Sequence, residues 1–187
     1  MFTLFRTSPI QEAARLAYGR VVEHARKPGF FLDHGVPDTV DGRFELICLH
    51  AFLYLQRLKR EHPQAVPLAQ RFFDTMFTDF DRSLREMGTG DLSVGREIKA
   101  MAQAFYGRVA AYERGLAGDD TVLQPALARN LFGTAPPKPS CLDAMARYMR
   151  REAAQLNRQE ADDLLAGRVS FGDPPAAVAI TASAGER

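Results

Sequence analysis

The chain has 187 residues, 46% of them hydrophobic and 25% charged, which is ordinary for one globular domain. A domain of this length buries about 70% of its unfolded surface, so it needs no disulfide framework and no structural metal to fold. The net charge of +1 argues against binding to DNA or another bulk polyanion, and the two cysteines, Cys48 and Cys141, indicate a reducing compartment.

The first helix is predicted from a capping signal near the start of the chain. Residues Ser8 to Gln11 have the form of a capping box with proline at the first helical position, which predicts a helix over residues 9–26. Pro28-Gly29 ends this helix. Residues 30–37 are then predicted to form a loop that packs on the body through Phe30, Phe31 and Leu32.

A second helix is predicted over residues 40–61, capped by Asp38 or Thr39 and ending before Pro63. Apolar residues surround most of its axis, which is typical of a helix buried on most sides. These residues are Phe44, Leu46, Ile47, Cys48, Leu49, Ala51, Leu53, Leu55 and Leu58. The sequence therefore predicts that this helix lies at the centre of the fold.

One polar stripe interrupts the apolar surface of that helix. Its members follow helical spacing and are Arg43, His50, Tyr54 and Arg57. The stripe suits contact with water or with an acidic neighbouring helix better than a binding role. His50 is accordingly expected to be a structural histidine with its hydrogen bonds satisfied.

Residues 72–108 predict two amphipathic helices joined by a glycine-containing elbow. The apolar stripe of the first is made by Ala69, Phe73, Met76, Phe77, Phe80, Leu84 and Met87. Gly88 follows where a left-handed residue ends a helix, and Asp91 or Ser93 is expected to cap the next one. The second stripe contains Ile98, Met101, Ala102, Phe105, Val109, Tyr112 and Leu116. Two stripes joined by so short a turn predict an antiparallel hairpin.

The remaining sequence predicts three further helical stretches and a proline-rich linker. Asp119 starts a short helix that reaches about Leu131, Ser140 with Asp143 starts another that reaches Leu156, and residues 159–165 form a last short stretch. The fold class is therefore all-α, a single-domain bundle of about six helices with a central apolar helix, a hairpin and a disordered tail. The expected boundaries are a helical domain over 1–171, with a core over 9–132, a linker over 133–139, C-terminal helices over 140–166, and a tail over 172–187.

The sequence contains no recognisable catalytic, cofactor or metal motif. None of the four histidines (His24, His34, His50 and His62) has a partner at HExxH spacing or a nearby cysteine pair, so no metal is predicted. The glycines at the elbow follow no strand and precede no Gly-Lys-Ser/Thr, which excludes a phosphate loop, and there is no GxSxG. We therefore expect no catalytic residue and no cofactor.

Arginine and aromatic side chains on a helical body favour protein recognition, because both residue types combine contact area with directional bonding. Each of these charges could equally be a solvated surface group. The candidate partner-binding residues are Arg43, Asp81, Arg82, Arg85, Glu86, Asp91, Lys99, Tyr106 and Arg108. The four apolar residues at the start, Met1, Phe2, Leu4 and Phe5, suit a membrane interface less well than the core or a frayed end.

Two stretches carry a resemblance to a known family: DTVDGRFELICLHAFLYLQRL, residues 38–58, and the elbow block over residues 74–108, whose most specific part is MFTDFDRSLREMGTGDLSVG. Over about residues 15–116 the chain resembles the ubiquinol-cytochrome c chaperone family. The resemblance implies an all-helical, non-enzymatic assembly factor that binds cytochrome b or the assembling bc1 complex. It leaves open whether a small partner protein or the ribosome also binds, as for mitochondrial members.

The expected location follows from the same resemblance and from the start of the chain. No stretch reaches the roughly 18 apolar residues of a spanning helix, and MFTLFRTSP matches neither a secretory signal nor a transit peptide. We expect the mature protein to be the chain as written, a bacterial cytoplasmic protein that works at the inner face of the cytoplasmic membrane, where peripheral membrane contact is compatible with its role.

Two competing functions remain. The first is an all-helical small-molecule-binding protein or enzyme with a cleft near His50 and Tyr54, recognisable by a closed pocket of about 300 Å³ or more with convergent polar groups. The second is a ribosome or RNA partner that uses the arginines and loses affinity steeply with salt. The near-neutral net charge ranks the second below the first.

Overall fold

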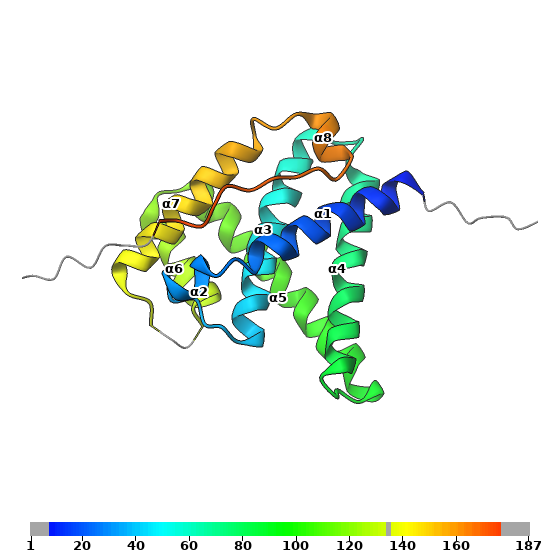
Figure 1. Ribbon diagram of the computed structural model, residues 1–187, viewed down its shortest axis with the longest axis horizontal. Helices are drawn as coiled ribbons and strands as arrows, with labels where there is room; N and C mark the ends of the chain where they lie inside the picture. Colours follow the sequence, from blue (N-terminus) through cyan, green and yellow to red (C-terminus); the bar gives the residue numbers. More distant parts are fainter. Residues whose placement is uncertain (1–7, 134–135, 177–187) are drawn as a thin grey trace, which may run out of the picture.

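A computed structural model describes residues 8–133 and 136–176, and within these ranges the chain is helical with no strand (Figure 1). Its elements are α1 (Pro9–Ala25), α2 (Gly29–Leu32), α3 (Val40–Leu58), the 3-10 turn η1 (Lys59–Glu61), α4 (Val66–Glu86), α5 (Asp91–Ala117), α6 (Asp120–Leu131), α7 (Pro139–Leu156) and α8 (Ala161–Leu165). The all-α fold class is confirmed. Met1, Phe2, Leu4 and Phe5 lie outside the described residues.

The starts of α1 and α3 agree with the capping signals, whereas the start predicted at Ser140 was wrong, because α7 begins at Pro139 with Lys138 at the N-cap position and no side-chain cap. The Ser8 hydroxyl accepts a hydrogen bond from the Gln11 amide, and the Thr39 hydroxyl accepts one from the Gly42 amide. Each bond satisfies a backbone donor that the first helical turn leaves without a partner. The predicted loop over residues 30–37 differs, because one helical turn, α2, forms at its start.

That turn corrects one packing expectation. Phe30 is fully buried and Phe31 packs against the core, as expected. Leu32, however, is 82% exposed. The short helical turn separates the directions of these consecutive side chains, so one packing surface cannot cover all three.

Helix α3 lies at the centre of the bundle, as its apolar sequence predicted. It contacts α1, α4, α5, α6 and α7, and its side chains belong to one continuous core that runs from Ala13 to Val169. None of the helices among the described residues combines the length and hydropathy that a bilayer crossing requires.

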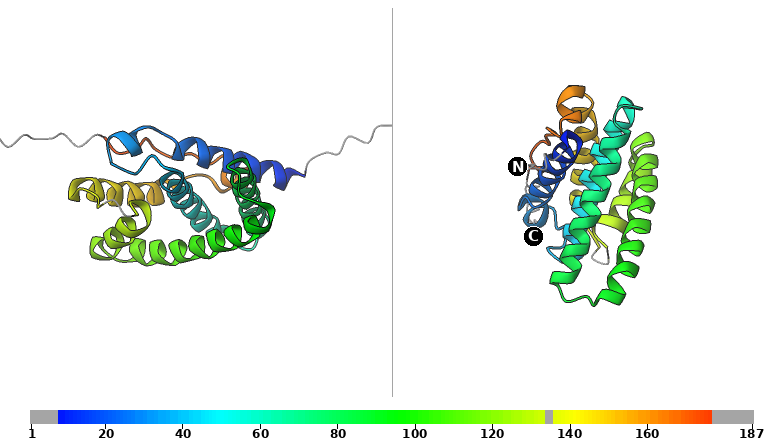
Figure 2. Two further views of the ribbon diagram at one scale, coloured as in Figure 1. Left: turned by 90° about the horizontal axis from the view of Figure 1, so that it is seen from below. Right: turned by 90° about the vertical axis from the view of Figure 1, so that its right-hand side faces the viewer.

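Helices α4 and α5 run in opposite directions beside each other (Figure 2), which confirms the hairpin. Helix α1 packs along α4. Aromatic rings join α1, α3 and α4: Tyr18 of α1 and Tyr54 of α3 both contact Phe72 of α4, with ring centroids 6.0 and 5.1 Å apart. The hairpin is therefore anchored to the body at the end away from its elbow, and the elbow projects from the body.

The C-terminal strap, residues 166–176, runs back from α8 towards α2 (Figure 1). Its Gly172 amide donates to the buried Glu152 carboxylate at 2.7 Å, Lys27 pairs with Asp173 at 2.7 Å, and a His34 ring nitrogen lies 2.8 Å from the Pro175 carbonyl oxygen. The expectation of disorder from residue 172 was therefore wrong for residues 172–176. The prediction used only the alanine- and proline-rich composition of this segment, which does not indicate polar contacts to residues far away in the chain.

A single substitution in the strap tests its packing. Gly167 has φ of 79°, and a Cβ there would lie 2.1 Å from the Ala13 carbonyl oxygen. We expect Gly167→Ala to lower the free energy of unfolding by about 2 kcal/mol, because positive φ and the backbone clash both oppose a side chain. Urea unfolding measures this. Gly19→Ala, with nothing within 4 Å of the added Cβ, is the matched control and should be neutral or slightly stabilising.

Candidate functional site

The elbow between α4 and α5 closes with the predicted glycine. Gly88 has φ of 89°, and the Thr89 amide donates to the Leu84 carbonyl at 3.0 Å, which satisfies an orphan group at the helix end. The expected cap of the next helix was wrong. The N-cap position is Gly90, without a side-chain cap, because Asp91 and Ser93 already lie inside α5, and the Asp91 carboxylate pairs with Arg85.

Paired charges surround this elbow. Arg82 contacts the carboxylates of Asp79 and Glu86, and Arg85 contacts those of Asp81 and Asp91, with 2.7 Å between Arg85 Nε and Asp81 Oδ2. Four carboxylates thus face two guanidinium groups. This end of the molecule is net acidic, because acids on α4 and α5 outnumber the arginines that they bind.

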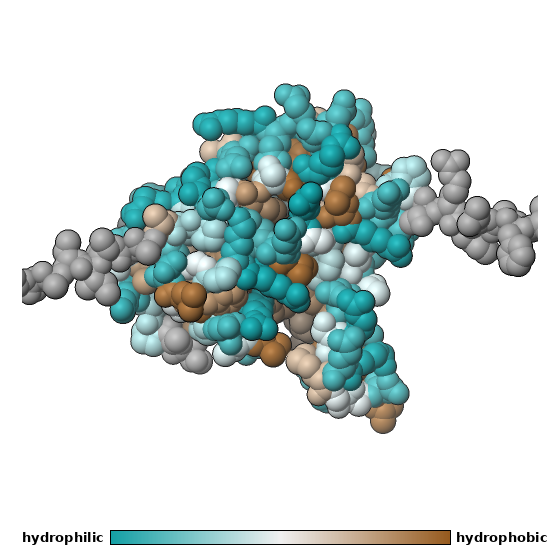
Figure 3. Space-filling model, viewed as in Figure 1, coloured by the Kyte–Doolittle hydropathy of each residue, from teal (hydrophilic) through white to brown (hydrophobic). Residues whose placement is uncertain are grey.

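Two apolar side chains lie at the tip, beside these charges. Leu92 is 100% exposed and Met87 is 54% exposed. Figure 3 shows the arm projecting from the body, mostly hydrophilic, with a hydrophobic spot at its end. We define the elbow surface as the five predicted residues that meet here together with these two: Asp81, Arg82, Arg85, Glu86, Met87, Asp91 and Leu92.

A groove of about 890 Å³ continues from the elbow surface between α1 and α4, and Arg82 and Glu86 line its near end. Inside it, the Tyr18 hydroxyl donates to Asp79 at 2.7 Å. Burial and this hydrogen bond raise the pKa of Tyr18, so the hydroxyl keeps its proton. The charged lining is balanced, with Arg15, Arg26, Arg71 and Arg82 against Glu23, Asp74, Asp79 and Glu86.

Sequence reasoning missed the α1 side of this groove. Arg15, Gly19 and Arg26 belong to no motif, and only the packing of α1 along α4 brings them opposite the polar face of α4. A weak signal was present, since Gly19 interrupts an otherwise well-formed helix and leaves open space where a side chain would stand.

The other four predicted residues lie away from the elbow surface. Tyr106 is 60% exposed, and its ring stacks on Phe73 of the neighbouring helix with centroids 5.7 Å apart. Lys99 is exposed on α5, and Arg43 pairs with Asp38 beside the start of α3.

Arg108 is held inside the fold by Glu45. Its guanidinium donates to both oxygens of the Glu45 carboxylate, and this pair joins α5 to α3. Arg108 therefore offers no free charge to a partner. It is a fold-stabilising residue, and we leave it out of the elbow surface.

The polar stripe on α3 faces the C-terminal part of the chain. The Tyr54 hydroxyl donates to the Leu164 carbonyl at 2.8 Å, and Arg57 Nε donates to the Leu156 carbonyl at 3.0 Å. His50 is fully buried against Tyr148. Neither His50 nor Tyr54 lines the α1–α4 groove or the smaller pocket between α3, α5 and α7. The competing small-molecule cleft at these residues was therefore wrong, because protein groups occupy their polar atoms.

The proton positions around Tyr148 follow from its partners. His50 Nδ1 lies 2.7 Å from the Leu46 carbonyl oxygen, which only accepts, so Nδ1 carries the proton of the neutral ring. His50 Nε2 then accepts from the Tyr148 hydroxyl at 2.7 Å, and His24 Nε2 donates to the same hydroxyl at 2.8 Å. Burial lowers the pKa of His50 to about 3 and that of His24 to about 4. This network holds neutral histidines and joins α1, α3 and α7.

Within residues 8–133 and 136–176, no three His, Cys, Asp or Glu side chains group as a metal site would require. The most prominent surface feature of these residues is the elbow region. It consists of a projecting arm with an apolar tip, paired charges behind the tip, and a mixed-charge groove leading away from it.

Comparisons with known proteins agree on one family. Residues 32–171 match the family described as Ubiquinol-cytochrome C chaperone. The chain is 28% identical over 156 residues to ubiquinol-cytochrome-c reductase complex assembly factor 1 of Xenopus laevis, covering 83% of this chain and 78% of that protein. The human protein of that name is 29% identical over 163 residues, covering 87% of this chain and 54% of that protein.

A solved structure has the same fold. The crystal structure of the Cbp3 homolog from Brucella abortus superposes with a TM-score of 0.79 at 37% sequence identity, covering 88% of this chain and 91% of that one. The similarity therefore extends beyond the elbow and the central helix to most of the helical body.

Proposed function

Because the chain belongs to the ubiquinol-cytochrome C chaperone family, we propose that it is a non-enzymatic assembly chaperone of the ubiquinol-cytochrome c reductase, or bc1, complex. The observation that carries the proposal is the family match over residues 32–171, joined by relatives that are named as assembly factors of that complex. The chain spans about half the length of the human relative, so the role proposed is that of the shared helical body.

The client in this proposal is cytochrome b, newly made or within an assembly intermediate. A membrane protein outside its complex presents apolar helix ends next to charged loops. The elbow surface offers the complementary mixture, since exposed Leu92 and Met87 lie beside paired guanidinium and carboxylate groups. The chaperone acts by occupancy, covering the client until the next subunit arrives, and it works at the membrane where that client is found.

Charge at the elbow bears on the competing RNA or ribosome role. Counterion release from phosphates requires cationic groups that are free to bind them. At the elbow surface both arginines already contact carboxylates. A protein client with both signs of charge therefore fits this surface better than RNA does.

The experiment is affinity capture of the tagged full chain, crosslinked in vivo in its own source and analysed by mass spectrometry. We expect cytochrome b among the captured proteins. Two variants should lose it: Leu92→Asp, which places a charge at the apolar tip, and the double variant Arg82→Ala/Arg85→Ala, which disrupts the paired charges. All three side chains are exposed, so both variants should stay folded, which circular dichroism checks.

Matched control variants test whether the loss of capture is specific to the elbow surface. Leu32→Asp changes another exposed leucine, on α2, and Arg20→Ala/Arg168→Ala removes two exposed arginines outside the elbow. These variants should capture cytochrome b as the unchanged chain does. Absence of every bc1 component from the unchanged chain would overturn the assembly role, whereas full capture by the elbow variants would overturn only the assignment of the surface.

A further inference from the structure

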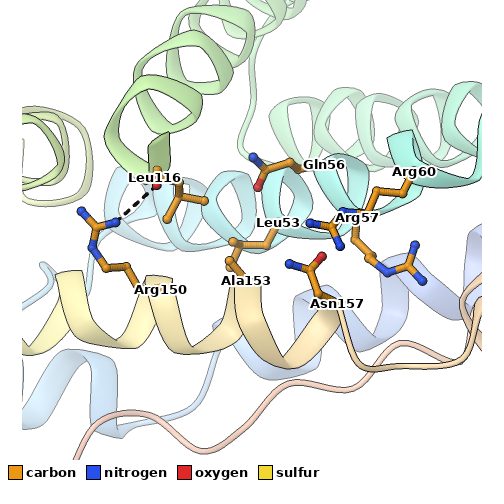
Figure 4. A pocket seen from close by; sticks show the side chains of 8 residues that line it. All are labelled: Leu53, Gln56, Arg57, Arg60, Leu116, Arg150, Ala153 and Asn157. Atoms are coloured by element: carbon orange, nitrogen blue, oxygen red, sulfur yellow. Dashed lines mark hydrogen bonds between the residues drawn. The ribbon is translucent and has the colours of Figure 1, made fainter. Parts of the chain in front are cut away.

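A second pocket lies between α3, the end of α5 and α7, and has a volume of about 320 Å³. Figure 4 shows its arrangement. Polar side chains gather at one end, and Leu53, Leu116 and Ala153 form an apolar middle. A space of this size suits a small organic group with one polar end and one apolar end.

Three side chains at the polar end have unused hydrogen-bonding capacity. Gln56, Arg60 and Asn157 line the pocket, and none of them makes a side-chain hydrogen bond or ion pair with residues 8–133 or 136–176. Their neighbour Arg57 differs, because it already donates to the Leu156 and Gln159 carbonyls and to Glu61. A ligand that enters this end therefore meets one free guanidinium group and two free carboxamides.

At the other end of the pocket, the polar side chain already has hydrogen-bond partners within the protein. Figure 4 shows Arg150 there, hydrogen-bonded to the Leu116 carbonyl at 3.3 Å. The same guanidinium binds the Gly115 and Gly118 carbonyls and pairs with Asp120. It closes the C-terminal end of α5, where unpaired carbonyl groups attract a cation.

The charge balance of the lining selects the class of ligand. No carboxylate lines the pocket. Glu61 compensates Arg57 and Asp120 compensates Arg150. Of the three arginines that line the pocket, Arg60 alone has no acidic partner among residues 8–133 and 136–176. A ligand with a single negative charge restores neutrality, whereas a phosphomonoester carries about 1.5 to 2 charges at neutral pH.

We propose that this pocket binds a carboxylate that carries an apolar group. Arg60 binds the carboxylate, whose two oxygens match the planar fork of a guanidinium. Gln56 and Asn157 donate to the same oxygens, and the apolar part lies on Leu53, Leu116 and Ala153. The ligand is a free small acid or the carboxyl terminus of a polypeptide, which share this chemistry. The proposal is independent of the client and the elbow surface.

The first test is a titration of the full chain, followed by ¹H–¹⁵N correlation spectra, with N-acetyl-leucine and with its uncharged amide, N-acetyl-leucinamide. We expect saturable shifts at pocket residues on α3 and α7 with the acid, and a dissociation constant at least about tenfold higher for the amide, because a charge-assisted hydrogen bond is lost. Equal affinities for the two probes, or no saturable shift with the acid, would overturn the proposal.

A second comparison identifies the source of the carboxylate and excludes a lipid. A pentapeptide that ends in leucine with a free carboxyl group should bind more tightly than N-acetyl-leucine if the ligand is a polypeptide terminus, and equally if it is a small acid. Dihexanoyl phosphatidylglycerol carries a monoanionic phosphodiester instead. Tighter binding of this lipid than of either carboxylate would overturn the carboxylate assignment.

Variants then connect the binding to the named residues. Arg60→Gln should raise the dissociation constant of N-acetyl-leucine at least about tenfold, and Arg60 is exposed, so the fold should be unaffected. The matched control is Arg96→Gln, another exposed arginine, on α5, which should bind the probe unchanged. Unaltered binding by the Arg60 variant would show that the acid binds elsewhere and would overturn the assignment.

Discussion

Replacement of Arg108 by alanine is expected to lower the free energy of unfolding by about 3–5 kcal/mol, because it leaves the Glu45 carboxylate buried without its partner. The exposed fractions of the two side chains are 17% for Arg108 and 9% for Glu45, and Arg108 Nε lies 2.5 Å from Glu45 Oε2. The guanidinium also lies 5.5 Å from the centre of the Phe44 ring. Burial raises the pKa of Glu45 and the ion pair opposes this, so loss of Arg108 should favour the protonated acid.

Chemical denaturation at pH 7 measures this loss. Arg96→Ala on the same helix is the matched control, since Arg96 is exposed and pairs with Glu97, whose side chain is 46% exposed, and it should cost less than about 1 kcal/mol. The double variant Glu45→Leu/Arg108→Leu should recover much of the stability, because an apolar pair leaves no buried charge. An Arg108→Ala protein as stable as the unchanged chain would contradict the structural role.

Acidification from pH 6.5 to pH 5 is expected to lower the free energy of unfolding by about 2–4 kcal/mol through His24 and His50. An ordinary histidine has a pKa of 6.5, whereas in the fold the pKa is about 4 for His24 and about 3 for His50. Below pH 6.5 the unfolded chain binds protons that the folded chain excludes. Each histidine therefore removes about 1.4 kcal/mol of stability per pH unit, until the pH reaches its own folded pKa.

Urea unfolding at several pH values tests this, with variants that separate the contributions. His50→Gln should remove about half of the pH dependence of the free energy of unfolding. The test compares the slope of that free energy against pH, so the variant's own stability at pH 7 does not affect it. His62→Gln is the matched control, since His62 is exposed after η1, and it should keep the slope of the unchanged chain. Retention of the full slope by the His50 variant would show that other groups titrate.

The expectation that the polar stripe on α3 meets water or an acidic neighbouring helix was wrong for His50, Tyr54 and Arg57, which are buried against α7 and α8. His50, Tyr54 and Arg57 share a face of a buried helix, and such a stripe occurs in binding sites as well as in cores. Their partners are Tyr148, Leu164 and Leu156, which lie about a hundred residues later in the chain. No local pattern identifies those partners, because the hydrogen bonds depend on how α7 and α8 pack across α3.

Most helices of this protein follow from its sequence alone. Ser8 and Thr39 cap the starts of α1 and α3, and Gly88, with positive φ, follows the end of α4. The apolar residues around α3 place that helix at the centre of the bundle. These features depend on groups within a few residues of one another, namely caps, helical period and positive φ. The grouping of Arg82, Arg85 and Asp91 at the elbow is also local, since a short turn joins their helices.

The tertiary structure alone decided which polar side chains line a groove or lie in solvent and which are held inside the fold. Arg108 and Arg82 look equivalent in the sequence, yet one is held by Glu45, 63 residues earlier, and the other lines a groove. The groove lies where α1 packs along α4, and Tyr18 there meets Asp79, 61 residues away. The strap is held by contacts to Glu152 and Lys27. A side chain's burial depends on helices that its own neighbours in sequence do not specify, so the free energy of these contacts appears only when the bundle is complete.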